Sequence, residues 1–161
     1  PYAGPANAPQ TLIMFYDYSC GYCKSANDAL NHLLATKKDL RVIYKPCALL
    51  GDASQYLAKL SLAVYITDPD KFKPIHDELM NINHITKNTV VNIITKHGLD
   101  YTTIELALDS KRVNDMLKQI GTQSVRLFLK GVPAFIINDK IYAGISNLGD
   151  FIRLLDINPA N

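Results

Sequence analysis

The sequence predicts an α/β domain in which a block of helices interrupts a βαβ…ββα framework. Two short apolar runs at 11–16 and 40–44 flank a helical pattern at 22–34, which is the arrangement of a βαβ unit. Residues 51–129 then carry helical patterns with no strand signal among them. Strand character returns at 134–143, and a last helix follows it.

The first part of the framework is a predicted pair of parallel strands joined by a helix. The run 11–16 is apolar throughout, as in a strand that is covered on both faces. The helix at 22–34 places Ala26 and Leu30 on one side, and Pro46 is expected to end the second strand. A right-handed crossover between parallel strands follows from this order.

The inserted segment contains several start and stop signals for helices. Asp68 is an N-cap followed by Pro69 at the first helical position, and Gly98 suits the left-handed position that ends a helix. Thr102 and Glu105 match a capping box that opens a short helix. The expected helices are 53–66, 69–80, 86–97, one from 102 onward, and 110–129.

The final part is a predicted hairpin and helix. Strands at 134–137 and 141–143 are separated by turn-forming residues. Asn147 is expected to cap the last helix, whose inner face carries Phe151 and Leu155.

These patterns divide the chain into three parts. Residues 1–10 have neither the basic nor the apolar region of a signal peptide, so they are expected to be a linker or a trimmed N-terminus. The framework is expected at 11–50 and 130–157, and the all-helical insertion at 51–129.

Composition excludes several classes of function. With 48% apolar and 20% charged residues, the chain is expected to form an ordinary packed core. A net charge of +2 is too small to indicate nucleic acid or an anionic membrane surface as a partner. No apolar run approaches the roughly 18 residues of a membrane-spanning helix.

The most informative motif is Cys20-Gly21-Tyr22-Cys23, directly after the first predicted strand. Two cysteines at this spacing can close and reopen a small disulfide, and only a thiolate attacks a disulfide. Cys20 would lie at a helix N-terminus, which favours an anion, while Cys23 would face inward one turn later. We therefore expect Cys20 to be the nucleophile and Cys23 the resolving thiol, with no dissociable cofactor.

Other interpretations of the cysteines stay open at this point. The pair could be structural, or half of a metal site, although the sequence offers no second ligand pair. Cys47 is the odd third cysteine and is expected to be a small buried side chain or a further redox thiol. The four histidines are scattered and are expected at the surface or at helix ends; they are His32, His76, His84 and His97.

The whole pattern resembles the DsbA-like family of thiol-disulfide oxidoreductases, which have a thioredoxin fold with a helical insertion. The resemblance rests on FYDYSCGYCK, FKPIHDELM, HGLD and GVPAFIIN, and it extends from about residue 11 to 155. These details look most like the ScsC-like branch of the family. The resemblance implies a periplasmic protein whose signal peptide is not in this sequence.

The resemblance also implies site residues beyond the cysteines. The proline that matches Pro133 is expected to be cis and to lie against the cysteine pair, while the backbone of Val132 docks the substrate. Gly21 and Tyr22 are expected to contribute to substrate binding. A glutamate of better-known members is replaced by Met14, so Asp17 and Lys45 are the candidates for a proton relay.

The expected function is disulfide exchange with unfolded or partly folded secreted proteins, as an oxidase and in part as an isomerase. One alternative is an isomerase or reductase kept reduced by a membrane thiol transporter. Another is a copper-binding protein that uses the cysteine pair as soft ligands. A membrane redox partner is expected, and a homo-oligomer could form through a missing N-terminal segment.

Overall fold

A five-stranded mixed sheet forms the centre of the protein, described here for residues 1–156 of a computed structural model. The strand order is β1-β3-β2-β4-β5. β2 (Gln10–Tyr16) runs parallel to β3 (Leu40–Pro46), as the predicted βαβ unit requires. β4 (Ala134–Ile137) pairs antiparallel with β2, and β5 (Lys140–Ala143) closes the predicted hairpin.

The strand at one edge was not predicted. β1 (Tyr2–Ala3) pairs antiparallel with β3, so part of the expected linker is a strand instead. Its pairing is extended by Pro1, whose carbonyl oxygen accepts the backbone N–H of Tyr44 at 2.9 Å. Two residues are too few to show a strand pattern, and the open edge of β3 supplies the hydrogen bonds.

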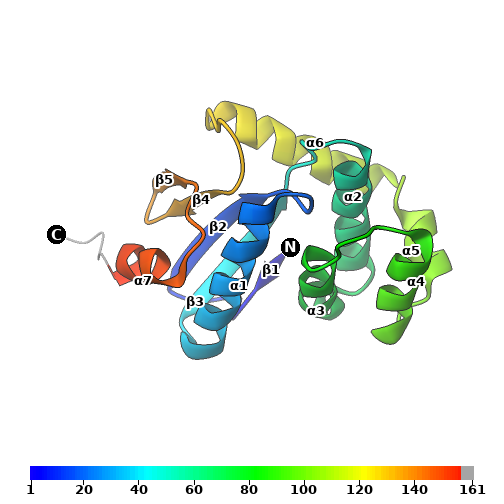
Figure 1. Ribbon diagram of the computed structural model, residues 1–161, viewed down its shortest axis with the longest axis horizontal. Helices are drawn as coiled ribbons and strands as arrows, with labels where there is room; N and C mark the ends of the chain where they lie inside the picture. The colour runs from blue at the N-terminus through cyan, green and yellow to red at the C-terminus, as the bar shows by residue number, and fades with distance from the viewer. Residues whose placement is uncertain (157–161) are drawn as a thin grey trace.

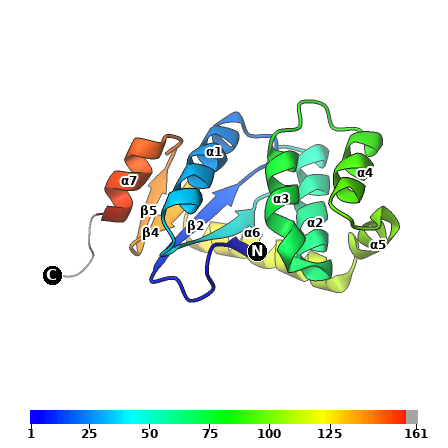
Figure 2. The same ribbon diagram turned by 90° about the horizontal axis from the view of Figure 1, so that it is seen from below.

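Helices cover both faces of the sheet (Figures 1 and 2). α1 (Gly21–Thr36) and α7 (Leu148–Asp156) lie on one face, and α6 (Lys111–Arg126) lies across the other. The rings of Phe135 on β4 and Phe151 on α7 meet edge to face, with centroids 4.9 Å apart. This contact fixes α7 against the sheet.

The inserted helices stand beside the sheet (Figure 1). The first part of α6 lies with them, and the rest of α6 crosses the sheet. Asp68 caps α3 by accepting the N–H of Asp70, and Gly98 has a φ of +80° just after α4, as predicted. The four helices before α6 are α2 (Asp52–Thr67), α3 (Pro69–Met80), α4 (Lys87–Lys96) and α5 (Tyr101–Ala107).

The predicted start of α5 is wrong. Asp100 is the N-cap, and its carboxylate accepts the N–H groups of Thr102 and Thr103. The predicted capping box therefore lies inside the first turn of the helix. An aspartate two residues earlier offers two oxygens to the free N–H groups, whereas a threonine hydroxyl offers one.

The sheet topology gathers three chain segments at one edge. The carboxyl ends of β2 and β3 meet there because the strands are parallel, with Tyr16 opposite Pro46. β4 begins at the same edge because Ala134 lies opposite Phe15. The residues that follow β2, follow β3 and precede β4 therefore come together. Among the helices of residues 1–156, none is both long and apolar enough to cross a membrane.

Candidate active site

Two motifs more than a hundred residues apart meet at this edge of the sheet. The thiol of Cys20 donates to the carbonyl oxygen of Val132 at 3.7 Å. The Val132–Pro133 peptide bond is cis, as the resemblance implied. The structure thus brings the cysteine motif together with the segment that was expected to dock the substrate.

Cys20 occupies the N-cap of α1. Its backbone is extended, and its sulfur accepts the N–H of Cys23 at 3.4 Å. A sulfur here takes the place that a serine or aspartate oxygen usually fills at a helix start. The free N–H groups and the helix dipole favour negative charge at this atom, which suits an attacking thiolate.

Cys23 differs from Cys20 in its surroundings. Cys20 is partly exposed, whereas Cys23 is fully buried. Burial raises the pKa of the Cys23 thiol strongly, and the hydrogen bond with Cys20 raises it further. In the reduced protein Cys23 is therefore held as a thiol. This arrangement agrees with an outer attacking cysteine and an inner resolving one.

Asp17 is buried between the strand end and the cysteine motif. Its carboxylate accepts the backbone N–H of Ser19 at 2.8 Å and the hydroxyl of Ser54 at 2.6 Å. It also accepts the N–H groups of Leu49 and Leu50 at 2.8 and 3.1 Å. Asp17 therefore connects the cysteine turn, the segment after β3 and the start of α2.

Lys45 lies on the other face of the sheet from α1. It lines a cavity of about 340 Å³ with Phe15 on β2 and with Arg126 and Leu127 at the end of α6. Partial burial lowers the pKa of its ammonium group. Because Cys23 is on α1, the sheet separates Lys45 from Cys23, and this placement does not favour Lys45 as a proton relay.

Met14 stands where the resemblance implied a glutamate. It is fully buried and pairs with Tyr44 of β3 in the parallel ladder. The side chains of Met14 and Tyr44 are both buried in the core, so this position supplies no carboxylate to the cysteine site.

Cys47 is a buried side chain at the end of β3. It is 5% exposed, and its N–H donates to the carbonyl oxygen of Tyr16 at 2.6 Å. Burial raises the pKa of its thiol to about 12, and the nearby carboxylate of Asp17 adds to this effect. The prediction of a small buried side chain is confirmed.

Apolar side chains are exposed around the cysteine motif. Tyr22, inside the motif, is 71% exposed, and Gly21 is exposed beside it. Leu49 and Leu50 are 58% and 54% exposed, and the hydrogen bonds of Asp17 place them beside the cysteine turn. Large apolar side chains that face solvent near a reactive cysteine suit contact with another polypeptide.

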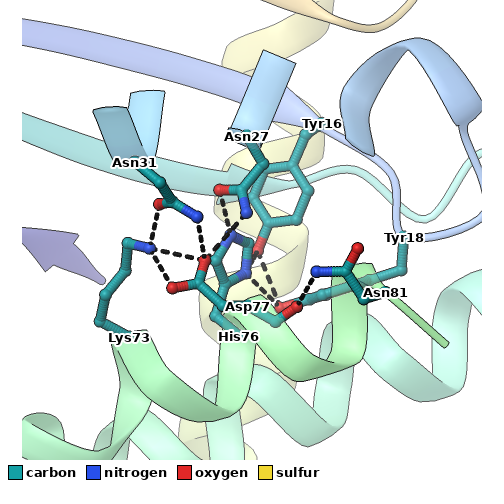
Figure 3. Close-up of polar contacts among 8 residues, drawn as sticks. All are labelled: Tyr16, Tyr18, Asn27, Asn31, Lys73, His76, Asp77 and Asn81. Carbon is teal, nitrogen blue, oxygen red and sulfur yellow. Dashed lines mark hydrogen bonds and ion pairs between the residues drawn. The ribbon is translucent and has the colours of Figure 1, made fainter. Parts of the chain in front are cut away.

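A polar cluster between α1 and α3 was missed by the sequence analysis (Figure 3). His76 is fully buried, so its expected place at the surface or at a helix end was wrong. Its ring bonds the hydroxyl of Tyr18 at 2.8 Å through Nδ1 and the amide oxygen of Asn27 at 3.1 Å through Nε2. The spacing held a signal, since His76 lies four residues from both Phe72 and Met80 on the inner stripe of α3.

Charged groups complete the cluster at its outer side. Asp77 accepts from the amides of Asn27 and Asn31 on α1 and pairs with Lys73 one turn earlier on α3 (Figure 3). Burial lowers the pKa of His76 to about 3, and the Lys73 cation acts in the same direction. His76 is therefore neutral, and the cluster ties the insertion to the framework helix that carries the cysteines.

The fold and the site together define a thioredoxin-fold protein with a two-cysteine motif beside a cis-proline segment. The DSBA-like thioredoxin domain model matches residues 11–156. The chain therefore belongs to this family, whose members are thiol-disulfide oxidoreductases. The predicted fold class, a thioredoxin fold with inserted helices, is confirmed.

Individual relatives agree with this assignment. Disulfide bond formation protein D of Bacillus subtilis is 24% identical over 94% of this chain and 72% of its own length. The catalytic domain of Proteus mirabilis ScsC is 25% identical, covers 96% of this chain and 86% of its own, and superposes with a TM-score of 0.85. The thiol-disulfide exchange protein alpha-DsbA2 of Wolbachia pipientis is 25% identical, with 97% and 85% coverage and a TM-score of 0.89.

Proposed function

We propose that this protein exchanges disulfides with unfolded or partly folded secreted proteins through Cys20 and Cys23. The observation that carries the proposal is the contact of the Cys20 sulfur with the carbonyl oxygen of Val132. It joins the reactive atom to a backbone group at which an extended peptide can pair as an added strand.

In the oxidising direction, a substrate thiolate attacks Cys20 of a Cys20–Cys23 disulfide. The S–S bond breaks, a mixed disulfide forms at Cys20, and the Cys23 sulfur leaves and takes a proton. A second substrate thiolate then attacks the substrate sulfur of the mixed disulfide, and Cys20 leaves. Two substrate thiols have lost two electrons and two protons, and the protein now holds two thiols.

The surroundings of the two sulfurs support this division of roles. The N-cap position of Cys20 favours a thiolate, which makes Cys20 both a good leaving group and an attacking group. The buried Cys23 accepts a proton readily, since its thiol pKa is raised. The electrons pass between protein thiols, so no dissociable cofactor is part of the proposal.

The substrate is proposed to contact Val132, Pro133 and the exposed residues of the cysteine motif. Tyr22 is largely exposed, and Gly21 is exposed beside it, with no atom from another part of the chain within 4 Å of where its side chain would start. An apolar surface accepts many sequences, which suits an enzyme for unfolded chains.

The compartment and partners are proposed from the same chemistry. A disulfide that is repeatedly formed needs an oxidising compartment, so we place the protein in the bacterial periplasm. A membrane redox partner would restore the active oxidation state after each cycle. A homo-oligomer is proposed as the arrangement that would favour isomerisation.

The direction of exchange is proposed to be oxidation, with some isomerisation. Gly21 and Tyr22 place no cation between the cysteines, so the thiolate of Cys20 is less stabilised than in a motif that contains histidine. The disulfide should therefore be a milder oxidant than that of such a motif, which is why some isomerisation is included in the proposal. The alternative is an isomerase or reductase that is kept reduced by a membrane thiol transporter.

Refolding of a disulfide protein tests the proposal. The oxidised protein should restore activity to reduced ribonuclease, and its reduced form should restore activity more slowly to ribonuclease with scrambled disulfides. Cys20→Ser should abolish both activities, while Cys47→Ala should keep each within about twofold, because a buried thiol with a raised pKa does not compete. Equal activity of wild type and Cys20→Ser would overturn the proposal.

A further inference from the structure

The two leucines after β3 are held in place although their side chains face solvent. Leu49 is 58% and Leu50 54% exposed, yet the backbone N–H groups of both donate to the same oxygen of Asp17, Oδ2. An exposed loop usually satisfies its N–H groups with water. Here a buried carboxylate fixes two successive residues of the loop.

The same carboxylate is fixed on its other side to the cysteine turn. Asp17 Oδ1 accepts from Ser19 N–H and from the hydroxyl of Ser54, and the Ser54 hydroxyl also lies 2.9 Å from that of Ser19. The carbonyl oxygen of Asp17 accepts the N–H of Cys20 at 3.2 Å. Asp17 thus fixes the positions of Cys20 and of the two leucines relative to one another.

A carboxylate suits this position better than an amide. Four hydrogen-bond donors point at Asp17, three of them backbone N–H groups, and a carboxylate accepts at both of its oxygens. An asparagine would turn an N–H group toward one set of these donors. Burying a carboxyl group is costly unless its oxygens are hydrogen-bonded, and each oxygen of Asp17 accepts from two donors.

We propose that Asp17 is a positioning residue that holds Leu49 and Leu50 as an apolar docking edge beside Cys20. The occupant is the apolar sequence next to a cysteine in an unfolded polypeptide. We choose this occupant because Asp17 bonds the backbones of both leucines and of Cys20, so a chain bound at the Cys20 sulfur lies close to the two leucines. The inference rests on the proposed function and names what the site selects.

The test uses two peptides that each carry one cysteine in a mixed disulfide with glutathione. One peptide has leucine and phenylalanine around the cysteine, and the other has serine and glycine. Reduced protein attacks the peptide sulfur through Cys20, and Cys23 resolves the bond. The products are the peptide thiol, glutathione released from its mixed disulfide with the peptide, and oxidised protein. Single-turnover rates against peptide concentration give a half-saturating concentration and a limiting rate.

Asp17→Asn should raise the half-saturating concentration of the apolar peptide about tenfold, because burial of two leucine side chains on the substrate is lost. The serine-flanked peptide should change by less than about twofold in this quantity. The double substitution Leu49→Ser/Leu50→Ser should give the same loss, and adding Asp17→Asn to it should cause little further loss, as for residues that act as one unit.

Leu106→Ser is the matched control, since Leu106 is 80% exposed on α5 and should leave the preference unchanged. The inference is overturned if Asp17→Asn weakens both peptides equally or changes only the limiting rate. It is also overturned if the double leucine variant keeps the wild-type preference, a result that does not depend on how well Asp17→Asn folds. If reduced wild type neither forms the Cys20–Cys23 disulfide nor releases either peptide as a thiol, the proposed function fails instead.

Discussion

The three cysteines differ in how far water and reagents reach them. Cys20 is partly exposed at a helix start, Cys23 is fully buried, and Cys47 is 5% exposed. Burial raises the pKa of both inner thiols. In the reduced native protein at pH 8, iodoacetamide should therefore label Cys20 at least about 100-fold faster than Cys23 or Cys47.

Mass spectrometry of the labelled peptides measures this order directly. In unfolded protein all three cysteines should react at similar rates, which controls for sequence effects. Fast labelling of Cys47 in the native protein would contradict its place as an inert core residue.

His76 makes the stability of the fold depend on pH. Its folded pKa of about 3 lies below the ordinary value of 6.5, so the unfolded state binds a proton that the folded state does not. The stabilisation is complete above pH 6.5 and is lost as the pH falls toward 3. Between pH 6 and 4 this one group should lower the free energy of unfolding by about 1.4 kcal/mol per pH unit.

His76→Gln replaces the imidazole with an amide that also offers a hydrogen-bond donor and an acceptor but cannot titrate. Urea unfolding at several pH values should show a shallower pH slope for this variant than for wild type, whatever its stability at pH 7. Identical slopes would mean that the pKa of His76 does not change on folding, which would contradict its described burial.

At the element scale, the start of α5 distinguishes two possible caps. Asp100→Ala should lower the midpoint of thermal unfolding by about 3 °C, because two N–H groups at the helix start lose their acceptor. Thr102→Ala should change the midpoint much less, since Thr102 is within the helix. The reverse order, measured by circular dichroism, would support the capping box that the sequence predicted.

An aromatic contact helps to attach α7 to the sheet. Phe151 is fully buried against Phe135, so Phe151→Ala should lower the free energy of unfolding by about 3–5 kcal/mol. Ile152→Ala, next to it on the exposed side of the same helix, should cost far less. Equal losses from the two variants would contradict the described packing of α7.

Most elements could be predicted because their own residues carry the signal. The runs that became β2 and β4 are apolar, and Asp68, Gly98 and Asn147 mark helix ends through local hydrogen bonds or backbone conformation. β1 could not be predicted, because its pairing is determined by the edge of β3 rather than by its two residues. His76 was misplaced because its environment is built from α1 and from Tyr16 and Tyr18 at and just after the end of β2, which lie far away in the sequence.

At the scale of the whole molecule, the topology assembles a site that no single segment contains. Cys20 and Cys23 could be identified from their spacing, and Val132–Pro133 from the resemblance. The hydrogen bonds of Asp17 to Leu49 and Leu50 could not, because they depend on β2 and β3 ending side by side. Chemical motifs are local, whereas the residues that position them are defined by the fold.

Equilibration of the protein with defined ratios of reduced and oxidised glutathione tests the central claim most directly. We expect one reversible disulfide between Cys20 and Cys23, with Cys47 remaining a free thiol. Its potential should be more reducing than the roughly −120 mV of DsbA, because Gly21 and Tyr22 supply no cation. If no Cys20–Cys23 disulfide forms at any ratio, the account of this protein as a thiol-disulfide oxidoreductase is contradicted.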